Sequence, residues 1–273
     1  METLTVDTLV ARLEALLPQA SSATSATVAL AFDGDGTLWK GDIGEDFFHA
    51  MVESGDLRPA AVDAMRAVAR QAGLELPDRD AGVAVARRLF DAYIAHQLAE
   101  DVICEVITWM CAGWRGKDVA AFAALVLKRE GFEGRRHPEL ARVIDWARGA
   151  GLSTLLVSAS PRPIVEAAGA ALGFEPRDVI AVTAAVDPAG VVLPEVVRPI
   201  PYGPGKASLL AARLLQGDGS ALLAAFGDNV FDVPMLEAAQ LPVVVDPKSR
   251  LVAHLARQSL RGSRGEAVQL IVK

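Results

Sequence analysis

The periodicity of apolar residues changes several times along the chain, and each change predicts a boundary between elements. Residues 5–17 carry apolar side chains at intervals of three and four, which predicts an amphipathic helix that ends at Pro18. The small residues 19–26 that follow predict a linker. The apolar, partly β-branched residues 27–32 then predict a buried strand that leads directly into a glycine-rich loop.

The next part of the chain, up to about residue 136, has helical periodicity throughout and shows no strand alternation. Asp42, followed three residues later by Glu45, predicts an N-cap with its capping-box partner at the start of this part. The predicted helices span residues 47–54, 59–72, 81–98, 102–110 and 117–130. We therefore expect a helical insert between the first strand and the rest of a sheet.

Strand and helix patterns alternate from about residue 137 to the end of the chain. Strands are predicted at residues 152–157, 222–226 and 241–245, with a hairpin from 179–186 and 191–193 around the turn 187–190. Helices are predicted from 138 to about 149, from about 161, from 206 to 215, from about 233 and from 249. Such alternation predicts an α/β fold with a parallel, doubly wound sheet.

These patterns also predict the domain organisation. We expect an N-terminal helix and linker at residues 1–26, an α/β core made of 27–43 and 137–273, and an all-helical domain at 44–136. The chain has 273 residues, of which 52% are apolar, and this is enough to build a large core together with an inserted domain.

Composition and charge exclude several classes of protein. The net charge is −7 and no long run of lysine and arginine occurs, so nucleic acid is not an expected partner. Cys104 and Cys111 form no metal-ligand or disulfide pattern, which fits a reducing compartment. Neither a signal peptide nor an apolar run of the ~18 residues that a membrane span needs is visible. We expect a cytoplasmic protein without membrane partners; the sequence leaves its oligomeric state open.

Two carboxylates follow the first predicted strand. Asp33 and Asp35 alternate with Gly34 and Gly36, so the backbone of this loop can approach a ligand closely. In an open α/β sheet, ligands bind beyond the carboxyl ends of the strands, where this loop would lie. Because clustered carboxylates repel one another, they favour a hard cation such as Mg²⁺ between them.

Other polar residues follow later strands or precede helices, namely Ser158, Lys206, Asp228 and Asp232. Each has a simple structural explanation by itself: a serine caps a helix, a lysine after a Gly-Pro loop is exposed, and two aspartates favour a helix N-terminus. Together they supply what phosphoryl transfer through a covalent carboxyl phosphate requires. The combination and its order favour chemistry over chance.

The sequence from about residue 28 to 255 resembles the haloacid dehalogenase-like (HAD) superfamily. Its four motifs match at residues 32–37, 155–158, 206 and 227–232. The helical insert resembles the C1 cap of this family, and the layout is most similar to the phosphoserine-phosphatase-like branch. Phe231 stands where the phosphoserine phosphatase pattern has asparagine, so phosphoserine itself is not the expected substrate.

The resemblance implies a role for each motif residue. Asp33 would be the nucleophile and Asp35 the general acid and base. The implied phosphate-binding residues are Gly34, Ser158, Ala159 and Lys206. The implied Mg²⁺ ligands are Asp33, the backbone carbonyl of Asp35, Asp228 and, in or near the second shell, Asp232. The acid two residues after the nucleophile is typical of the phosphatases and mutases of the superfamily.

The expected function is therefore a Mg²⁺-dependent phosphatase that hydrolyses a small phosphorylated metabolite through an aspartyl-phosphate intermediate. A phosphomutase that uses the same two aspartates is the alternative among enzymes, and a non-catalytic HAD-like binding or regulatory domain is the alternative of another class.

We also hypothesise a substrate with a cationic end. In the branch that the chain resembles, an acid nine residues after the nucleophile faces an amino group of the substrate, and Asp42 has this spacing. The further candidates for contact with such a group are Glu45, Trp39, Trp109 and Trp114. The competing interpretation is that the two acids form a helix cap and that the tryptophans pack in a core.

Overall fold

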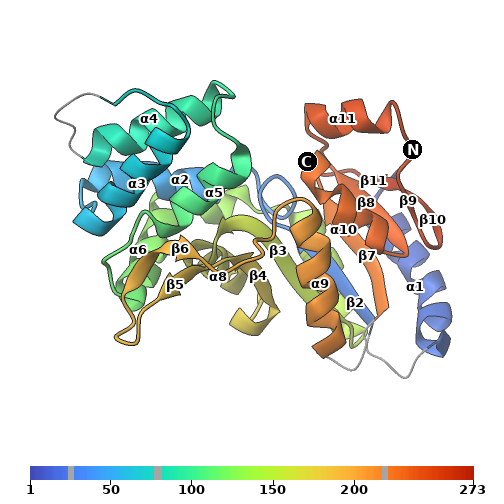
Figure 1. The fold of residues 1–273 in the computed structure, drawn as a ribbon. Helices are drawn as coiled ribbons and strands as arrows, with labels where there is room; N and C mark the ends of the chain where they lie inside the picture. Colours follow the sequence, from blue (N-terminus) through green and yellow to red (C-terminus); the bar gives the residue numbers. More distant parts are fainter. Residues whose placement is uncertain (24–27, 77–81, 217–220) are drawn as a thin grey trace.

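A seven-stranded parallel sheet lies at the centre of the protein (Figure 1). The computed structural model describes residues 1–23, 28–76, 82–216 and 221–273. The strands of this sheet are β1 (Glu2–Leu4), β2 (Val28–Asp33), β3 (Ser153–Pro161), β4 (Val179–Val182), β7 (Ala221–Gly227), β8 (Leu241–Val245) and β11 (Val268–Leu270). Their order is β1-β11-β8-β7-β2-β3-β4, and every neighbouring pair is parallel. The predicted doubly wound α/β fold is confirmed.

Two short antiparallel ribbons accompany the sheet. One pairs β5 (Ala184–Val186) with β6 (Val192–Val196), and the other pairs β9 (Arg261–Gly262) with β10 (Gly265–Glu266). The predicted turn at 187–190 joins β5 to β6, and the Asp187 carboxylate accepts hydrogen bonds from the Ala189 and Val191 N–H groups. The prediction that 179–186 forms a single hairpin strand is wrong, because β4 pairs with β3 in the main sheet.

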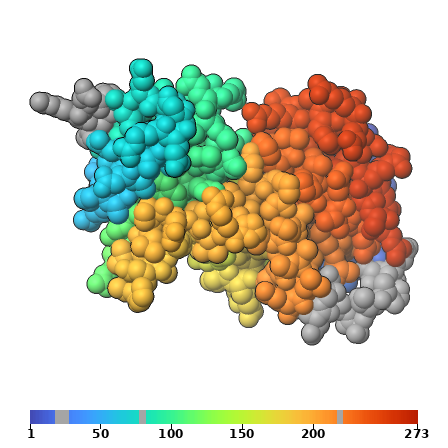
Figure 2. Space-filling model, in the orientation of Figure 1, coloured from blue at the N-terminus to red at the C-terminus, as the bar shows by residue number. Residues whose placement is uncertain are grey.

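The chain between β2 and β3 folds into helices, as its periodicity predicts. These helices are α2 (Ile43–Ser54), α3 (Pro59–Gln71), α4 (Gly82–Ile94), α5 (Glu100–Trp109), α6 (Gly116–Arg129), the 3₁₀ turn η1 (Phe132–Arg135) and α7 (Pro138–Gly149). Helices α2 to α6 and η1, called here the helical segment, gather at one end of the molecule and appear as a cyan and green lobe in Figure 2. The β5–β6 ribbon packs against α3 and α5 of this segment.

The N-terminal part differs from its prediction. Helix α1 (Val6–Ala23) does not end at Pro18, and the predicted linker is helical up to Ala23. A proline removes one main-chain donor, whereas the alanine, glutamine and serine residues after it can continue a helix. Strand β1 was not predicted, because with only Leu4 buried it is too short to show a period. Residues 24–26 of the predicted linker, residue 27 of the first strand and residue 81 of a predicted helix lie outside the described residues.

The remaining helices are α8 (Arg162–Ala170), η2 (Pro176–Asp178), α9 (Pro204–Gln216), η3 (Val230–Asp232), α10 (Val233–Ala238) and α11 (Ser249–Leu255). Successive residues of a strand face opposite sides of the sheet. Leu30 and Phe32 of β2 accordingly belong to the core that includes α1 and α7, whereas Ala31 belongs to the core that includes α9 and α10. Asp33, two residues after Ala31, therefore lies on the side of α9.

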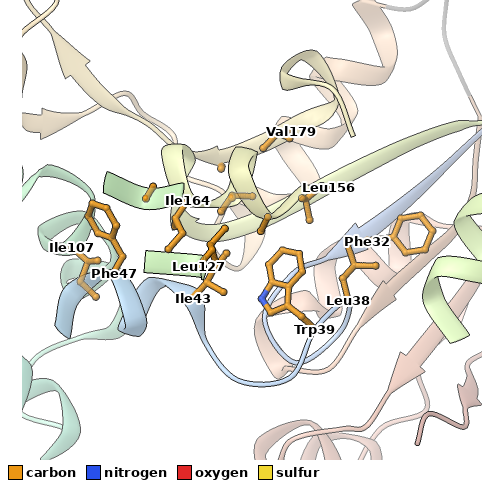
Figure 3. Packing of buried hydrophobic residues seen from close by; sticks show 14 of the residues in the cluster. Phe32, Leu38, Trp39, Ile43, Phe47, Ile107, Leu127, Leu156, Ile164 and Val179 are labelled. Atoms are coloured by element: carbon orange, nitrogen blue, oxygen red, sulfur yellow. The ribbon is translucent and has the colours of Figure 1, made fainter. Parts of the chain in front are cut away.

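The hydrophobic core continues from the sheet into the helical segment (Figure 3). Phe32 stacks on Phe226 of β7 with the ring centroids 4.5 Å apart, and Trp39, Ile43 and Phe47 extend the same cluster into α2. Burial of large aromatic side chains contributes roughly 1.5–3 kcal/mol each. This continuous packing fixes α2, and with it one side of the candidate site, against the sheet.

Candidate active site

A pocket lies at the carboxyl edge of the sheet, at the point where the order of the strands reverses. From β2 the next strands, β3 and β4, are added on one side, and β7 and β8 lie on the other. Such a switch point leaves a crevice in which α/β proteins bind ligands. Asp33 ends β2 and Asp228 directly follows β7, so both aspartates flank the switch point and line the pocket.

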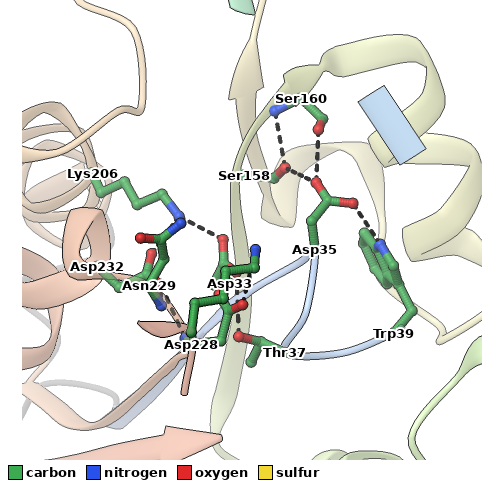
Figure 4. Close-up of polar contacts among 11 residues, drawn as sticks. Asp33, Asp35, Thr37, Trp39, Ser158, Ser160, Lys206, Asp228, Asn229 and Asp232 are labelled. Carbon is green, nitrogen blue, oxygen red and sulfur yellow. Dashed lines mark hydrogen bonds and ion pairs between the residues drawn. The ribbon is translucent and has the colours of Figure 1, made fainter. Parts of the chain in front are cut away.

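The carboxylate of Asp33 is paired with a buried lysine (Figure 4). Lys206 Nζ lies 2.5 Å from Asp33 Oδ1 and 2.5 Å from Asp232 Oδ1, although 173 residues separate Lys206 from Asp33. Burial alone would lower the pKa of Lys206, but the charges of Asp232 and Asp33 raise it above its ordinary value. The ammonium group therefore stays charged beside the carboxylate. Thr37 Oγ1 donates to Asp33 Oδ2 at 3.2 Å.

Asp228 and Asp232 differ in how well they are satisfied. Asp232 Oδ2 accepts the N–H groups of Asp228 at 3.1 Å and of Asn229 at 2.9 Å, so both of its carboxylate oxygens have partners. Asp228 Oδ2 pairs with Lys248 Nζ at 3.0 Å, whereas no described group hydrogen-bonds its buried Oδ1. Burial, followed by the charge of Asp33, raises the pKa of Asp228 to about 8. Lys206 and Lys248 thus leave part of the negative charge of the three aspartates uncompensated.

This cluster fits a divalent cation. Carboxylate oxygens of Asp33, Asp228 and Asp232 all lie within 4.8 Å of one another, and oxygen atoms are the ligands that Mg²⁺ prefers. The loop after β2 lies directly against these carboxylates: a Cβ on Gly36 would come within 2.1 Å of Asp228 Oδ2, and Gly36 has a φ of +88°. Three of the four predicted ligand residues are therefore brought together by their side chains.

Asp35 is held by hydrogen bonds on both of its oxygens. Oδ1 accepts the Trp39 indole N–H and the Ile43 backbone N–H, each at 2.8 Å. Oδ2 accepts the Ser160 hydroxyl at 2.7 Å and lies 3.5 Å from the Ser158 hydroxyl. The side chain is half-buried and lines the pocket beside Asp33.

Of the four predicted phosphate-binding residues, two line the pocket and two do not. Lys206 and Ala159 line the pocket. Ser158 is fully buried, and its Oγ accepts the Ser160 N–H at 3.1 Å, which leaves the hydroxyl proton for an acceptor. Gly34 is buried beneath the Trp39 ring, since a Cβ at this position would lie 2.7 Å from the ring. The Trp39 ring therefore packs against Gly34, which is not among the described residues that line the pocket.

Asp42 and Glu45 line the pocket from the helical segment. Asp42 caps α2, because its Oδ1 accepts the Glu45 N–H at 2.9 Å, so the predicted N-cap is confirmed. Burial, followed by the charge of Asp35, raises the pKa of Asp42. Burial also raises the pKa of Glu45. Both acids lie close to the negative charge of Asp35, and the charge of Lys248 offsets only part of this effect.

The tryptophans do not form the predicted aromatic faces of the pocket. Trp39 is fully buried with its edge toward Phe132, Trp109 packs in the core of α5, and Trp114 donates its N–H to the Asp56 carbonyl at 3.0 Å. Trp39 and Trp109 thus belong to the hydrophobic core and Trp114 packs against it, as the competing interpretation holds. Among the described residues, the aromatic side chains that line the pocket are Tyr93, Tyr202 and Phe231.

The polar residues near the site that were not assigned from the sequence include Thr37, Glu100, Ser160 and Lys248. Lys248 shortly follows β8, so the rule that selected Asp33 and Asp228 also applies to it. Thr37 lies inside the first motif and Ser160 lies two residues after the second, but their roles depend on side-chain contacts. Glu100 reaches the pocket through the fold of the helical segment and carries no local signal.

The fold is of the doubly wound α/β class, and an acidic cluster lies at the switch point of its sheet. The family model of the haloacid dehalogenase-like hydrolases matches residues 30–237, and the chain belongs to this family. The family resemblance seen in the motifs and the expectation of a hydrolase are confirmed. No curated protein sequence matches the chain.

Solved structures share the fold at low sequence identity. A protein of unknown function from Bordetella pertussis Tohama I is 20% identical with a TM-score of 0.66, over 89% of this chain and 98% of that one. A HAD family hydrolase from Salmonella enterica serovar Typhi is 15% identical with a TM-score of 0.53, over 88% and 73%. A phosphoaspartyl-intermediate analogue of phosphoserine phosphatase is 14% identical with a TM-score of 0.51, over 89% and 93%. Among the described helices, none has the length and apolar content to cross a membrane.

Proposed function

We propose that this hydrolase is a Mg²⁺-dependent phosphatase that acts on a small phosphorylated metabolite through an aspartyl phosphate on Asp33. The observation that carries this proposal is the buried pairing of Asp33 with Lys206 at 2.5 Å, next to Asp228 with its unpartnered oxygen. A nucleophilic carboxylate, an adjacent fixed cation and an acidic cluster suited to a metal are the parts that phosphoryl transfer requires.

In the first half of the reaction, a carboxylate oxygen of Asp33 attacks phosphorus while the bond to the leaving oxygen breaks. Asp35 donates a proton to that oxygen. Lys206 and the Ser158 hydroxyl stabilise the charge on the phosphoryl oxygens. When bound, Mg²⁺ supplies positive charge that shields the phosphoryl group from the carboxylates; Asp33 and Asp228 would hold it, with Asp232 behind them.

In the second half, Asp35 acts as the base. It takes a proton from water, the water oxygen attacks phosphorus, and the bond between phosphorus and Asp33 breaks to release phosphate. Asp232 keeps Lys206 in place throughout, because it pairs with the ammonium group independently of Asp33.

The helical segment, which we propose acts as a cap, forms the other wall of the pocket. Asp42, Glu45, Tyr93 and Glu100 come from this side, opposite Lys206 and Lys248 of the α/β core. Closure over a small pocket excludes water and large substrates, so a metabolite fits better than a phosphoprotein.

The charge of the pocket favours a substrate with a cationic end. Seven carboxylates and two lysines line it, so the pocket carries an excess of five negative charges when every carboxylate is ionised. Mg²⁺ would neutralise only two of them, and a phosphate ester adds negative charge. A positive group on the leaving alcohol, near Asp42, Glu45 and Tyr93, offsets the surplus.

Turnover of p-nitrophenyl phosphate and of a panel of phosphorylated metabolites, with and without Mg²⁺, tests the proposal. We expect release of inorganic phosphate that depends on Mg²⁺, with the highest kcat/KM for phosphorylated amino alcohols. Transfer of the phosphoryl group to a second position of the substrate without phosphate release would indicate a mutase instead. Absence of any turnover across the panel would favour a binding or regulatory domain.

A further inference from the structure

The two oxygens of Asp35 lie in chemically different surroundings (Figure 4). Oδ1 accepts two N–H groups, one from the Trp39 indole and one from the Ile43 backbone. These groups only donate, so Oδ1 must act as an acceptor. Oδ2 instead faces the Ser160 and Ser158 hydroxyls, which can donate or accept. The side chain is therefore asymmetric even before a substrate binds.

We propose that Asp35 transfers protons through Oδ2 alone and that Ser160 is the positioning residue that aims this oxygen. Trp39 completes the arrangement by fixing the opposite oxygen. The inference rests on the proposed phosphatase function, because it assigns roles within that reaction. Neither Ser160 nor Trp39 touches the phosphoryl group in this scheme; both act through Asp35.

Ser160 is well placed for this role. Its Oγ lies 2.7 Å from Asp35 Oδ2, it is only 7% exposed, and it still lines the pocket. Its own N–H is anchored on Ser158 Oγ at 3.1 Å. The first turn of α2 leaves room for the hydroxyl only because residue 44 is glycine: a Cβ there would lie 2.7 Å from Ser160 Oγ.

Trp39 is placed to hold the Asp35 carboxylate, and it is not placed to contact a ligand in the pocket. It is fully buried, its ring packs edge-on against Phe132 at 5.3 Å, and it is not among the described residues that line the pocket. A rigid indole N–H therefore fixes the rotamer of Asp35 from the side away from the substrate.

In the proposed reaction, each of the two lone pairs of Asp35 Oδ2 has its own partner. The Ser160 hydroxyl occupies one of them, and the proton that goes to the leaving oxygen occupies the other. As the bond from Asp33 to phosphorus forms and the bond to the leaving oxygen breaks, this proton moves to the leaving oxygen. In the second half a water proton returns to the same position, so no other reactant is needed.

A double-mutant cycle tests this role by single-turnover kinetics with an aryl and an alkyl phosphate. Ser160→Ala is expected to slow phosphorylation by the alkyl phosphate about tenfold, with little change for the aryl phosphate, because one aligned hydrogen bond is lost. In the Asp35→Asn background the same change is expected to have no further effect. Trp39→Phe, which removes the indole N–H together with part of the buried ring, should show the same dependence on the leaving group.

Matched variants provide the controls. Ser160→Thr keeps the hydroxyl and is expected to retain activity on the alkyl phosphate. Ser54→Ala and Trp146→Phe remove a hydroxyl and an indole N–H that bond Met51 and Glu14, away from the pocket, and should leave both rates unchanged. Thermal melting of each variant verifies that it is folded.

Two results would overturn the inference while leaving the phosphatase function in place. One is an equal loss for the aryl and the alkyl phosphate in Ser160→Ala, and the other is a full additional loss in the Asp35→Asn background. Failure of the wild-type protein to hydrolyse any phosphate ester would instead overturn the proposed function, and this inference with it.

Discussion

Lys206 shows how single residues prepare the site before a substrate arrives. Its ammonium group lies between Asp33 and Asp232, with both oxygens at 2.5 Å and the side chain only 5% exposed. Removing a charge from water is costly unless it is paired, and here the pairing places the cation beside the proposed nucleophile. Asp232 would continue to hold Lys206 in the proposed state in which Asp33 carries a phosphoryl group.

Asp33→Asn tests the nucleophile. The amide has the same shape but attacks phosphorus poorly, so turnover is expected to be abolished while the protein stays folded. Steady-state phosphate release and circular dichroism measure the two effects. Hydrolysis by this variant near the wild-type rate would show that Asp33 forms no phosphoryl intermediate.

Asp35→Asn separates the two steps of the reaction. Without an acid, the first step is expected to persist for an aryl phosphate, whose leaving group needs no proton, and to slow about 10²-fold or more for an alkyl phosphate. Dephosphorylation should slow for both, since the base is also lost. Burst kinetics resolve the first step, and equal losses for the two esters would contradict the role of Asp35 as the acid.

Asp42→Asn tests the recognition of a cationic end. The amide keeps the shape of the side chain but loses its charge, so KM for phosphocholine or phosphoethanolamine is expected to rise well above any change for glycerol phosphate. Asp63→Asn, an exposed acid on α3, is the control and should change none of these values. If the three substrates respond alike, Asp42 serves only as a helix cap.

At the scale of elements, α2 joins the rest of the helical segment to the loop that carries Asp33 and Asp35. The segment joining β2 to α2 is held by the bond from the Ile43 N–H to Asp35 and by the Asp42 cap. Gly55 ends the helix with a φ of +67°, and its N–H bonds the Val52 carbonyl. Position and orientation of α2 therefore depend on the same few residues as the site.

The capping role of Asp42 has its own measurable consequence. Asp42→Ala is expected to lower the free energy of unfolding by roughly 0.5–2 kcal/mol, because the Glu45 N–H loses its acceptor, whereas Asp42→Asn should retain most of the stability. Chemical denaturation of the two variants measures the difference. Equal stabilities would show that the cap contributes little.

At the scale of the whole molecule, the two sides of the pocket are linked by ion pairs across the site. Glu100 at the start of α5 lies 3.3 Å from Arg250 of α11, and Glu105 lies 2.7 Å from Arg198. Partly exposed pairs of this kind contribute about 0–1 kcal/mol each, so they add little to the contact between the two sides. The main coupling between the two sides is the continuous hydrophobic core, together with the bond from the Ile43 N–H to Asp35.

Metal binding should stabilise the protein, because the cation binds the folded chain and not the unfolded one. Mg²⁺ at a hundredfold excess over its Kd is expected to add about 2.7 kcal/mol to the free energy of unfolding, which corresponds to a rise in Tm of roughly 5–10 °C. Asp228→Asn should lose this shift, since the carboxylate with the unpartnered oxygen is gone. KCl at equal ionic strength and the Asp63→Asn variant are the controls. An undiminished shift in Asp228→Asn would contradict the assigned metal site.

Much of the molecule could be predicted from its sequence, because helical and strand periods are local properties. The helices of the inserted segment, the strands that carry Asp33 and Asp228, and the parallel sheet all follow from patterns within a few residues. Two boundaries that failed, at Pro18 and in residues 179–186, lie where a single local signal competes with neighbouring helix formers or with pairing to a distant strand.

What only the tertiary structure decided is which side chains meet. The pairing of Lys206 with Asp33 depends on the alternation along β2, which directs Asp33 toward α9, and on the sheet order, which brings β7 beside β2. The same packing turns the tryptophans into the core and brings the Ser160 hydroxyl to Asp35. Contacts between residues far apart in the chain are set by register and by shape complementarity in the core, and neither is written in a local sequence pattern.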